Sequence, residues 1–363
     1  MRVSRGPGGR LGIAGFRSTA AAAAPVLVAD VGATSTRLAL VAGDRVSFTI
    51  LKQTVLTSRE CPGLESALRD FLGDSSSRPG NAVLAVAGPV VGGRAELTNL
   101  GWVLEEGSLA AALGLRSVRL VNDLVAMASA VPWLQAGDLV TLQNGCPTSD
   151  GARAVIAPGT GLGQAFLIWD GVEYRAHDSE GGHADFAPVG ELQDDLLDYL
   201  RSRYGHVSCE RVCSGRALPE LYEFLKARKT AVESEAIAGR LAAAQDRTPV
   251  IVEAGLASQP CPLSRATLEL FAAILAAEAG NLALRILATG GVYLGGGLPR
   301  RLLPLLNRPD FLARFGQKGR LSPLLATIPL HVIVRSGVGL LGASRLALAE
   351  AGQGGPTRSG AGR

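Results

Sequence analysis

The sequence has few cysteines and histidines and lacks any long apolar run. Its five cysteines are scattered, and no Cys-x-x-Cys pair occurs, which indicates a reducing compartment such as the cytoplasm without a disulfide framework. Cys209 and Cys213 could share one helix face, but no neighbouring cysteine or histidine completes a zinc site. The apolar runs 82–87 and 286–294 fall short of the roughly 20 residues that span a bilayer. We therefore expect no membrane anchor.

The sequence has no net positive charge outside the two ends of the chain. The formal net charge is +4, but residues 1–24 hold four arginines and no acid, and residues 352–363 hold two arginines and no acid. The rest of the chain has 30 basic and 32 acidic residues. A nucleic-acid partner requires basic residues clustered on one folded face, so we expect none. We expect both ends to be disordered, although the first could also be a transit peptide.

Apolar residues, in contrast, are abundant. Of the 363 residues 47% are hydrophobic and 19% are charged, which supports a packed core and predicts about two domains. Residues 26–41 read as an apolar run, a turn rich in small and hydroxyl residues, and a second apolar run, which predicts a β-hairpin. Residues 154–169 repeat this layout at the same internal spacing, with residues 30–36 opposite residues 158–164. The chain therefore looks internally duplicated.

The turns of the two predicted hairpins are candidate phosphate sites. Successive backbone N–H groups in such a turn can form a concave nest for an anion, although ordinary tight hairpins also contain glycine. A dinucleotide fingerprint needs a helix after the glycines of 159–163, whereas a strand-like run follows. A Walker A loop is excluded because no lysine follows either turn. Two turns, one in each half, could hold one polyphosphate between them.

Asn122 and Asp123 follow a strand-like run and precede an apolar stretch, which places them at a strand-to-helix junction. A carboxylate there is held rigidly and suits a general base, while both residue types also favour a helix N-cap. Glu180 and His183 form a second polar pair, separated by two glycines that let the backbone approach a ligand. Glu210 is a further candidate, although Arg211 could simply pair with it. Together these groups suit the recognition of adjacent sugar hydroxyls.

Nine ordered pieces of the sequence resemble the bacterial glucokinase family of the non-repressor type, within the hexokinase and actin-like ATPase superfamily. They lie between about residues 25 and 349 and are DVGATSTRLAL, LTNLGW, VNDLVAMA, APGTGLGQA, EGGHADFAP, GHVSCERVCSG, GGVYLGGGLPR, FGQKGR and GVGLLGAS. The resemblance implies an α/β fold of two ribonuclease H-like (actin-like ATPase) domains with the active site in the cleft between them. It also implies an ATP-dependent kinase of glucose.

The resemblance further implies a role for each candidate residue. Asp123 would be the base that takes the proton of the sugar 6-hydroxyl, and Asp30 would position Mg²⁺ through water. The other hydroxyls would be held by Asn122, Glu180, His183 and Glu210. The residues that would bind ATP are Asp30, Val31, Gly32, Ala33, Thr34, Ser35, Gly159, Thr160, Gly161, Gly295 and Gly296, with adenosine at 290–297.

The first turn departs from the family pattern, because the usual Asp-x-Gly-Gly-Thr-Asn becomes Asp-Val-Gly-Ala-Thr-Ser at residues 30–35. Ala33 restricts positive φ, which leaves the geometry of the phosphate turn in question. The zinc motif and the helix-turn-helix of related repressors are absent from the sequence. The alternatives are a kinase of another hexose such as mannose or N-acetylglucosamine, a non-catalytic sugar-binding regulator on the same fold, and an assembling actin-like ATPase.

The expected organisation has a small α/β domain at 25–133 and a large α/β domain at 134–334. A C-terminal helix at 335–351 is expected to return to the small domain, and disordered segments at 1–24 and 352–363 complete the chain. Glucose and ATP are the expected partners, and a homodimer is what the resemblance implies.

Overall fold

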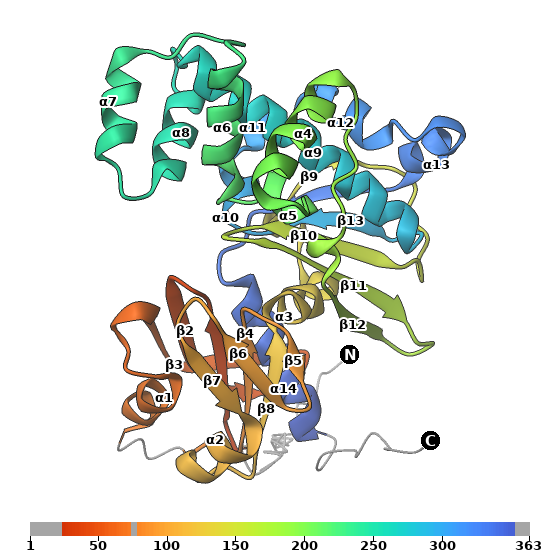
Figure 1. The fold of residues 1–363 in the computed structure, drawn as a ribbon. Coiled ribbons are helices and arrows are strands. Elements are labelled where there is room, and N and C mark those ends of the chain that lie inside the picture. Colours follow the sequence, from red (N-terminus) through yellow and green to blue (C-terminus); the bar gives the residue numbers. More distant parts are fainter. Residues whose placement is uncertain (1–23, 74–77, 353–363) are drawn as a thin grey trace, which may run out of the picture.

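The computed structural model describes residues 24–73 and 78–352. The sequence predicts disorder at 1–24 and 352–363. Of these two segments only residues 24 and 352 belong to the described residues, and the rest lies outside them. Two stacked lobes make up the described chain (Figure 1), each built on one large β-sheet.

The N-terminal lobe is built on a five-stranded sheet with the order β3-β2-β1-β4-β8. β1 (Val26–Val31) pairs antiparallel with β2 (Ser35–Gly43), which pairs antiparallel with β3 (Phe48–Thr57). On its other side β1 runs parallel to β4 (Asn81–Val86), and β4 runs parallel to β8 (Ser117–Asn122). The hairpin predicted at 26–41 is confirmed. A small sheet of β5 (Val90–Val91), β6 (Arg94–Leu97) and β7 (Trp102–Glu105) joins this lobe.

The C-terminal lobe repeats the same strand pattern. Its sheet has the order β12-β11-β10-β13-β14-β9, where the first three strands pair antiparallel and β10, β13 and β14 run parallel. These strands are β9 (Leu139–Gln143), β10 (Arg153–Pro158), β11 (Leu162–Trp169), β12 (Tyr174–Ser179), β13 (Gly291–Leu294) and β14 (Leu330–Ile333). The predicted duplication is thus visible in the first five strands of each order, and the second sheet adds β9 antiparallel to β14.

The two phosphate-turn hairpins differ in one detail from the sequence prediction. Val31 pairs with Thr36, so four residues form the first turn, whereas Pro158 pairs with Leu162, so three residues form the second. The spacing is therefore not equal, because the backbone closes the glycine-rich second turn one residue earlier.

Helices cover the faces of both sheets. In the N-terminal half these are α1 (Leu64–Leu72), α2 (Glu106–Leu113) and α3 (Asp123–Ala130), with the short η1 (Ser58–Glu60), η2 (Val131–Trp133) and η3 (Ala136–Asp138). After β12 come η4 (Gly181–His183), α4 (Glu191–Tyr204), α5 (Cys209–Val212), α6 (Ala217–Ala227), α7 (Glu235–Ala243), α8 (Arg247–Leu256) and α9 (Pro262–Arg285). The last are α10 (Gly297–Arg301), α11 (Leu303–Leu306), α12 (Pro309–Gly316), η5 (Gly319–Leu321), α13 (Ser322–Thr327) and α14 (Val338–Gly352).

One helix among the described residues is long and apolar enough to cross a membrane. This helix is α9, and 78% of its most apolar window is buried inside the fold. Its side chains Leu268, Phe271 and Leu275 are fully buried in the core of the C-terminal lobe. Its apolar composition is thus accounted for by core packing.

Helices α3 and α14 connect the two lobes. The α3 side chain of Leu124 packs in a core cluster of the C-terminal sheet, whereas Ala126 packs with α14 on the N-terminal sheet. Figure 1 shows α14, the last helix of the chain, lying against the N-terminal lobe. It begins at Val338 rather than at the expected residue 335, because Gly337 has a φ of +69° that interrupts helical geometry.

The crossing of α14 and α3 is too close for a side chain on Gly342. A Cβ atom at this position would lie 1.6 Å from the carbonyl oxygen of Ala126, so the backbone of one helix would have to move. We expect Gly342→Ala to destabilise the protein by about 3 kcal/mol, at the upper end of the usual cost of overpacking.

The matched control is Gly107→Ala in α2, where nothing lies within 4 Å of the added Cβ and where alanine should stabilise the helix by roughly 0.5–1 kcal/mol. Urea unfolding of both variants measures the two effects. If both substitutions changed the free energy of unfolding by the same amount and in the same direction, the close crossing of α3 and α14 would be contradicted.

Candidate active site

The candidate residues gather at the carboxyl ends of the parallel strands, where ligands of open α/β sheets bind. Asp30 is the penultimate residue of β1, and Asn122 is the last residue of β8, followed directly by Asp123 at the start of α3. The predicted strand-to-helix junction at these residues is confirmed. In the second sheet Gly159 follows β10 and Gly295 follows β13.

Asn122 is the N-cap of α3. Its Oδ1 accepts a hydrogen bond from Leu124 N at 2.8 Å, and its Nδ2 donates to the carbonyl oxygen of Gly88 at 3.1 Å. The capping interpretation of the sequence is thus confirmed for this residue. The amide retains one N–H and one lone pair with which it could contact a ligand.

Asp123 carries the largest electrostatic perturbation of the site. Burial in the cleft, followed by the negative charges of Asp30 and Glu180, raises its pKa to about 7, although its Oδ1 accepts a hydrogen bond from Leu124 N at 3.0 Å. The carboxylates of β1, α3 and the segment after β12 therefore lie within electrostatic reach of each other. A pKa near neutrality is typical of a group that exchanges protons in a reaction.

Asp30 is half-buried next to the first residues of α14. Burial raises the pKa of its carboxyl group, and Arg37, whose Nη1 lies 3.7 Å from Oδ2, opposes this rise. A Cβ atom on Gly339 would come within 2.9 Å of the same carboxylate oxygen. The glycine therefore allows the last helix to start directly beside Asp30.

Glu180 and His183 lie together after β12. The carboxylate Oε2 and the imidazole Nε2 are 3.9 Å apart, and both side chains are more than half exposed. A Cβ on Gly181 would meet Gln164 Oε1 at 2.3 Å, and one on Gly182 would meet the Leu162 carbonyl oxygen at 2.1 Å. The two glycines thus allow a close approach to β11, and their approach to a ligand stays a prediction.

Glu210 joins α5 to the second phosphate turn. Its Oε2 accepts a hydrogen bond from Leu162 N at 2.9 Å and would lie 2.3 Å from a Cβ on Gly161. The surface pair with Arg211 is not what holds Glu210, because the Arg211 guanidinium lies 4.0 Å from the ring centre of Tyr204.

The first phosphate turn is held by η1. The Ser58 hydroxyl donates to the carbonyl oxygen of Gly32 at 2.7 Å, and Ser58 N donates to the Thr34 carbonyl oxygen at 3.1 Å. Ala33 is not among the described residues that have a positive φ. The alanine therefore fits the turn without backbone strain, which answers the question that its methyl group raised.

The second phosphate turn is held by the loop before α6. Gly159 N donates to the Gly161 carbonyl oxygen at 2.8 Å, and Gly215 N donates to the Gly159 carbonyl oxygen at 2.7 Å. Thr248 Oγ1 in turn donates to the carbonyl oxygen of Gly215 at 2.9 Å. Gly159 and Thr160 themselves are exposed, so their backbone is open to a ligand.

Gly295 and Gly296 differ in their access to solvent. Gly295 is buried, and a Cβ there would lie 2.3 Å from the sulfur of Met127 in α3. Gly296 is partly exposed and has a φ of +88°. The first glycine is therefore required by packing, whereas the second can present its backbone to a nucleotide.

The acidic groups fit a divalent cation that is held jointly with a polyphosphate. The described residues include no group of three or more Cys, His, Asp or Glu side chains that could hold a metal ion. Asp30 and Asp123, however, repel each other across the cleft, and a cation would relieve this repulsion. Mg²⁺ is usually bound by one or two carboxylates, water and substrate phosphates, which is the set that this cleft can offer.

Two groups of residues that sequence reasoning missed support the site. Arg216 Nη2 donates to Asn99 Oδ1 at 2.8 Å and so links the loop beside the second phosphate turn to the N-terminal lobe. Asn99 lies within LTNLGW, one of the pieces that carry the family resemblance, but the motif alone did not indicate what Asn99 contacts. The buried Gln164 Nε2 donates to the buried Glu278 Oε1 at 3.0 Å beneath Gly181, and no local pattern announces this pair.

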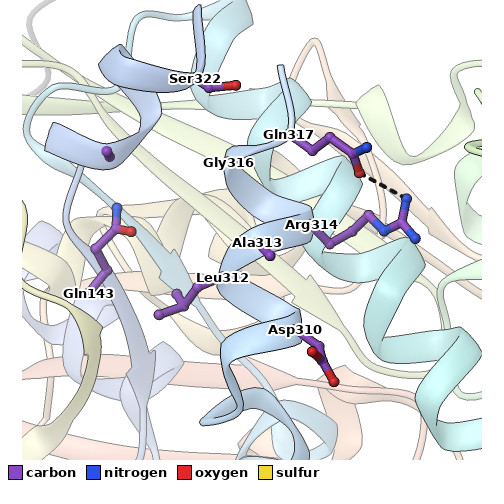
Figure 2. A pocket seen from close by; sticks show the side chains of 9 residues that line it. Gln143, Asp310, Leu312, Ala313, Arg314, Gly316, Gln317 and Ser322 are labelled. Carbon is purple, nitrogen blue, oxygen red and sulfur yellow. Dashed lines mark hydrogen bonds between the residues drawn. The ribbon is translucent and has the colours of Figure 1, made fainter. Parts of the chain in front are cut away.

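One cavity of the described residues lies away from the candidate site residues. It has a volume of about 760 Å³ and lies between α12, α13 and the end of β9. Figure 2 shows Arg314 beside Gln317, whose Oε1 accepts its hydrogen bond at 3.0 Å. None of the predicted site residues lines this cavity.

Comparison with known proteins gives one consistent result. A model of the family described as "Glucokinase" matches residues 27–350. A curated protein named "Glucokinase" from Trichormus variabilis is 41% identical over 334 residues, which cover 88% of this chain and 97% of the relative.

Solved structures agree with these sequence matches. The crystal structure of a glucokinase from an Antarctic psychrotroph is 32% identical, has a TM-score of 0.74, and is matched over 89% of this chain and 98% of its own. A ROK family glucokinase from Streptomyces griseus, solved in complex with glucose and AMPPNP, is 20% identical with a TM-score of 0.60 over 89% of this chain and 99% of its own, which shows the fold alone. The predicted α/β fold of two actin-like ATPase domains is confirmed.

The buried charge of Asp123 should cost the ligand-free protein stability. Its pKa is about 7 in the folded state and 3.8 without the fold, so the stability that it contributes is lost as the pH rises through this window. Asp123→Asn keeps an Oδ1 acceptor for Leu124 N and removes the charge. We expect the variant to be more stable than the parent, and the gain to be larger at pH 8 than at pH 5 by up to about 3 kcal/mol.

Chemical unfolding at both pH values measures this gain. The exposed Asp150→Asn is the matched control and should show no difference between the two pH values. An equal gain for Asp123→Asn at both values would show that its carboxyl group is not perturbed.

Proposed function

This chain belongs to the glucokinase family, and we propose that it transfers the γ-phosphoryl group of ATP to the 6-hydroxyl of glucose with Asp123 as the general base. The reaction of the family, ATP-dependent phosphorylation of glucose, is the activity of this enzyme. The observation that carries the role of Asp123 is its pKa of about 7 at the start of α3, between Asp30 and Glu180. A base near neutral pKa can take the hydroxyl proton as the hydroxyl attacks.

We assign the recognition of glucose to the polar groups around Asp123. Glu180 and His183 present exposed side chains at the rim, and Asn122 retains a donor and an acceptor after capping α3. Glu210 has one oxygen committed to Leu162 N, which leaves its other oxygen for a sugar hydroxyl. Carboxylate, amide and imidazole groups held in this way suit bidentate hydrogen bonds with adjacent hydroxyls.

We assign the phosphates of ATP to the two hairpin turns. The exposed Thr160, on a turn held by Gly215, can donate its backbone N–H to a phosphate oxygen, whereas Gly159 N is already bonded to the Gly161 carbonyl oxygen. In the first turn the corresponding residues are 30–35, and Gly296 offers its backbone beside the adenosine. When bound, Mg²⁺ would supply charge neutralisation at the phosphates, and Asp30 would hold it through water.

Catalysis in this arrangement rests on positioning. Phosphoryl transfer leaves little covalent work for the protein, so alignment of the hydroxyl with the γ-phosphate and stabilisation of spread charge dominate. The Arg216–Asn99 contact between the lobes supports closure of the cleft over both substrates. Closure would keep water away from ATP until a sugar is bound.

The surroundings of the enzyme are also a proposal. All five cysteines are free thiols, which supports a cytoplasmic location. Assembly as a homodimer stays a prediction.

Replacement of the base should separate binding from chemistry. We expect Asp123→Asn to bind glucose within a few-fold of the parent, because Oδ1 remains a hydrogen-bond acceptor, but to lose about 10²- to 10⁴-fold in kcat, the usual contribution of a general base. A coupled assay with Mg²⁺ and ATP on glucose, mannose and N-acetylglucosamine measures kcat, and calorimetry measures glucose binding. Near-normal turnover would exclude Asp123 as the base.

The negative charge of Asp30 should shift the pH dependence of the reaction, because it contributes to the raised pKa of Asp123. In the parent enzyme kcat/KM should fall below about pH 7, since Asp123 must be ionised to accept a proton. Asp30→Asn removes the strongest repelling charge, so the pKa of Asp123 falls and the inflection moves to lower pH, whatever the loss in rate. Glu180→Gln is the control and should move it less, because Glu180 contributes less to the rise. An inflection that stays in place in Asp30→Asn would contradict the coupling.

A further inference from the structure

A second cavity is lined by residues of both lobes, including residues of α3 and α14. It has a volume of about 640 Å³. α14 contributes Arg345, which lies six residues, or about 9 Å along the helix, beyond Gly339 beside Asp30. Both lobes supply walls of this cavity, which we call the hinge pocket: it is lined among others by Arg45, Trp133, Trp169, Arg175, Arg345 and Glu350.

The hinge pocket has an excess of positive charge. Four arginines and two glutamates line it. Arg45 pairs with Glu173 across the lobes, and the other two close pairs are Arg119 with Glu350 and Arg175 with Asp170. Glu173, Glu350 and Asp170 neutralise three of the four arginines, which leaves one positive charge in the lining, that of Arg345.

Arg345 is the one arginine of this lining without a carboxylate partner among the described residues. The field of Asp44 reaches it, but burial and the charges of Arg45 and Arg335 oppose its protonated state and lower its pKa. Arg345 is partly buried, and a cation withdrawn from water beside other cations is costly unless an anion joins it. The pocket therefore lacks a negative charge that a ligand can supply.

The position of Arg345 is fixed by aromatic rings. Its guanidinium carbon lies 4.2 Å from the ring centre of Trp133 and 4.9 Å from that of Phe48, and its Nη1 donates to the carbonyl oxygen of Arg45. The Nε atoms of Arg45 and Arg345 are buried and have no hydrogen-bond acceptor among the described residues. These Nε atoms are closed to solvent, so a phosphate would be bound by the terminal Nη groups of the two guanidinium groups, both of which lie near the Trp133 ring.

We propose that the hinge pocket binds a small organic phosphate, with Arg345 and Arg45 on the phosphate and the indole rings of Trp133 and Trp169 against its organic body. The volume suits a molecule of this size. The two ends of the chain do not match the pocket in charge, because residues 1–24 and 352–363 contain arginine but no acid. The pocket shares no lining residue with the cleft that holds the candidate catalytic groups.

Occupation of the hinge pocket acts on the relative position of the lobes. Its phosphate ligands come from the N-terminal lobe and α14, whereas Trp169 and Arg175 come from the C-terminal sheet. A ligand that bridges them favours one arrangement of the lobes, and by linkage it changes the affinity of the cleft for glucose. The pocket is therefore a regulatory site.

Isothermal titration with phenyl phosphate tests the site, because this probe combines a phosphate with a flat apolar ring. The full-length protein is kept saturated with glucose and AMPPNP so that the cleft is filled. We expect a Kd below 1 mM that is at least fivefold lower than the Kd of inorganic phosphate. A fivefold difference corresponds to about 1 kcal/mol, which the contact of the phenyl ring with the pocket should supply. Arg345→Met should weaken binding at least tenfold, and the exposed, distant Arg320→Met should not.

Arg175→Gln is the second pocket variant and should weaken binding at least threefold. It keeps the test decisive if Arg345→Met does not fold. The site is overturned if phenyl phosphate does not bind, if inorganic phosphate binds equally well, or if neither pocket variant weakens binding. A separate titration of glucose, with and without saturating phenyl phosphate, should show a change of about fivefold or more in the glucose Kd. An unchanged Kd would overturn the regulatory role.

Discussion

The contact between α3 and α14 is the constraint on which both lobes depend. At Gly342 the last helix approaches the backbone of α3 so closely that a single methyl group cannot be inserted. Leu124 and Ala126, two residues apart on α3, belong to different hydrophobic clusters, one for each sheet. The relative position of the two sheets is therefore set by small residues at one crossing, since larger ones would hold the helices at the usual 8–10 Å separation of their axes.

The same crossing assembles the charges of the cleft. α3 begins with Asp123, and α14 begins beside Asp30, so the packing that joins the lobes also brings two carboxylates into a poorly solvated space. Burial, and next the negative charge of Asp30, raise the pKa of Asp123 to about 7. The ionised carboxylate of Asp123 therefore lowers the stability of the fold at the position where the reaction needs a proton acceptor. Such a trade of stability for activity is common at active sites.

Local sequence patterns predicted much of this structure, and the misses have physical causes. Hairpins, the strand-to-helix junction and the duplication follow from periodicity and turn residues, which act over short distances. The roles of Gly181 and Gly295 could not be seen, because both glycines are required by contacts with Gln164 and Met127 that only the tertiary fold creates. The Arg216–Asn99 bond joins residues 117 positions apart, and the roles of the site residues remain predictions from family resemblance.

The place of α14 in the chain has a consequence for biosynthesis. This helix covers one face of the N-terminal sheet, with Leu340, Ala343 and Ala347 packed against Val28 and Val83, yet it ends at Gly352 near the end of the chain. A ribosome completes the strands of that sheet some 200 residues before it makes their cover. The nascent first lobe thus exposes an apolar face throughout synthesis of the second lobe, and such exposed surface is where chaperones bind and aggregation begins.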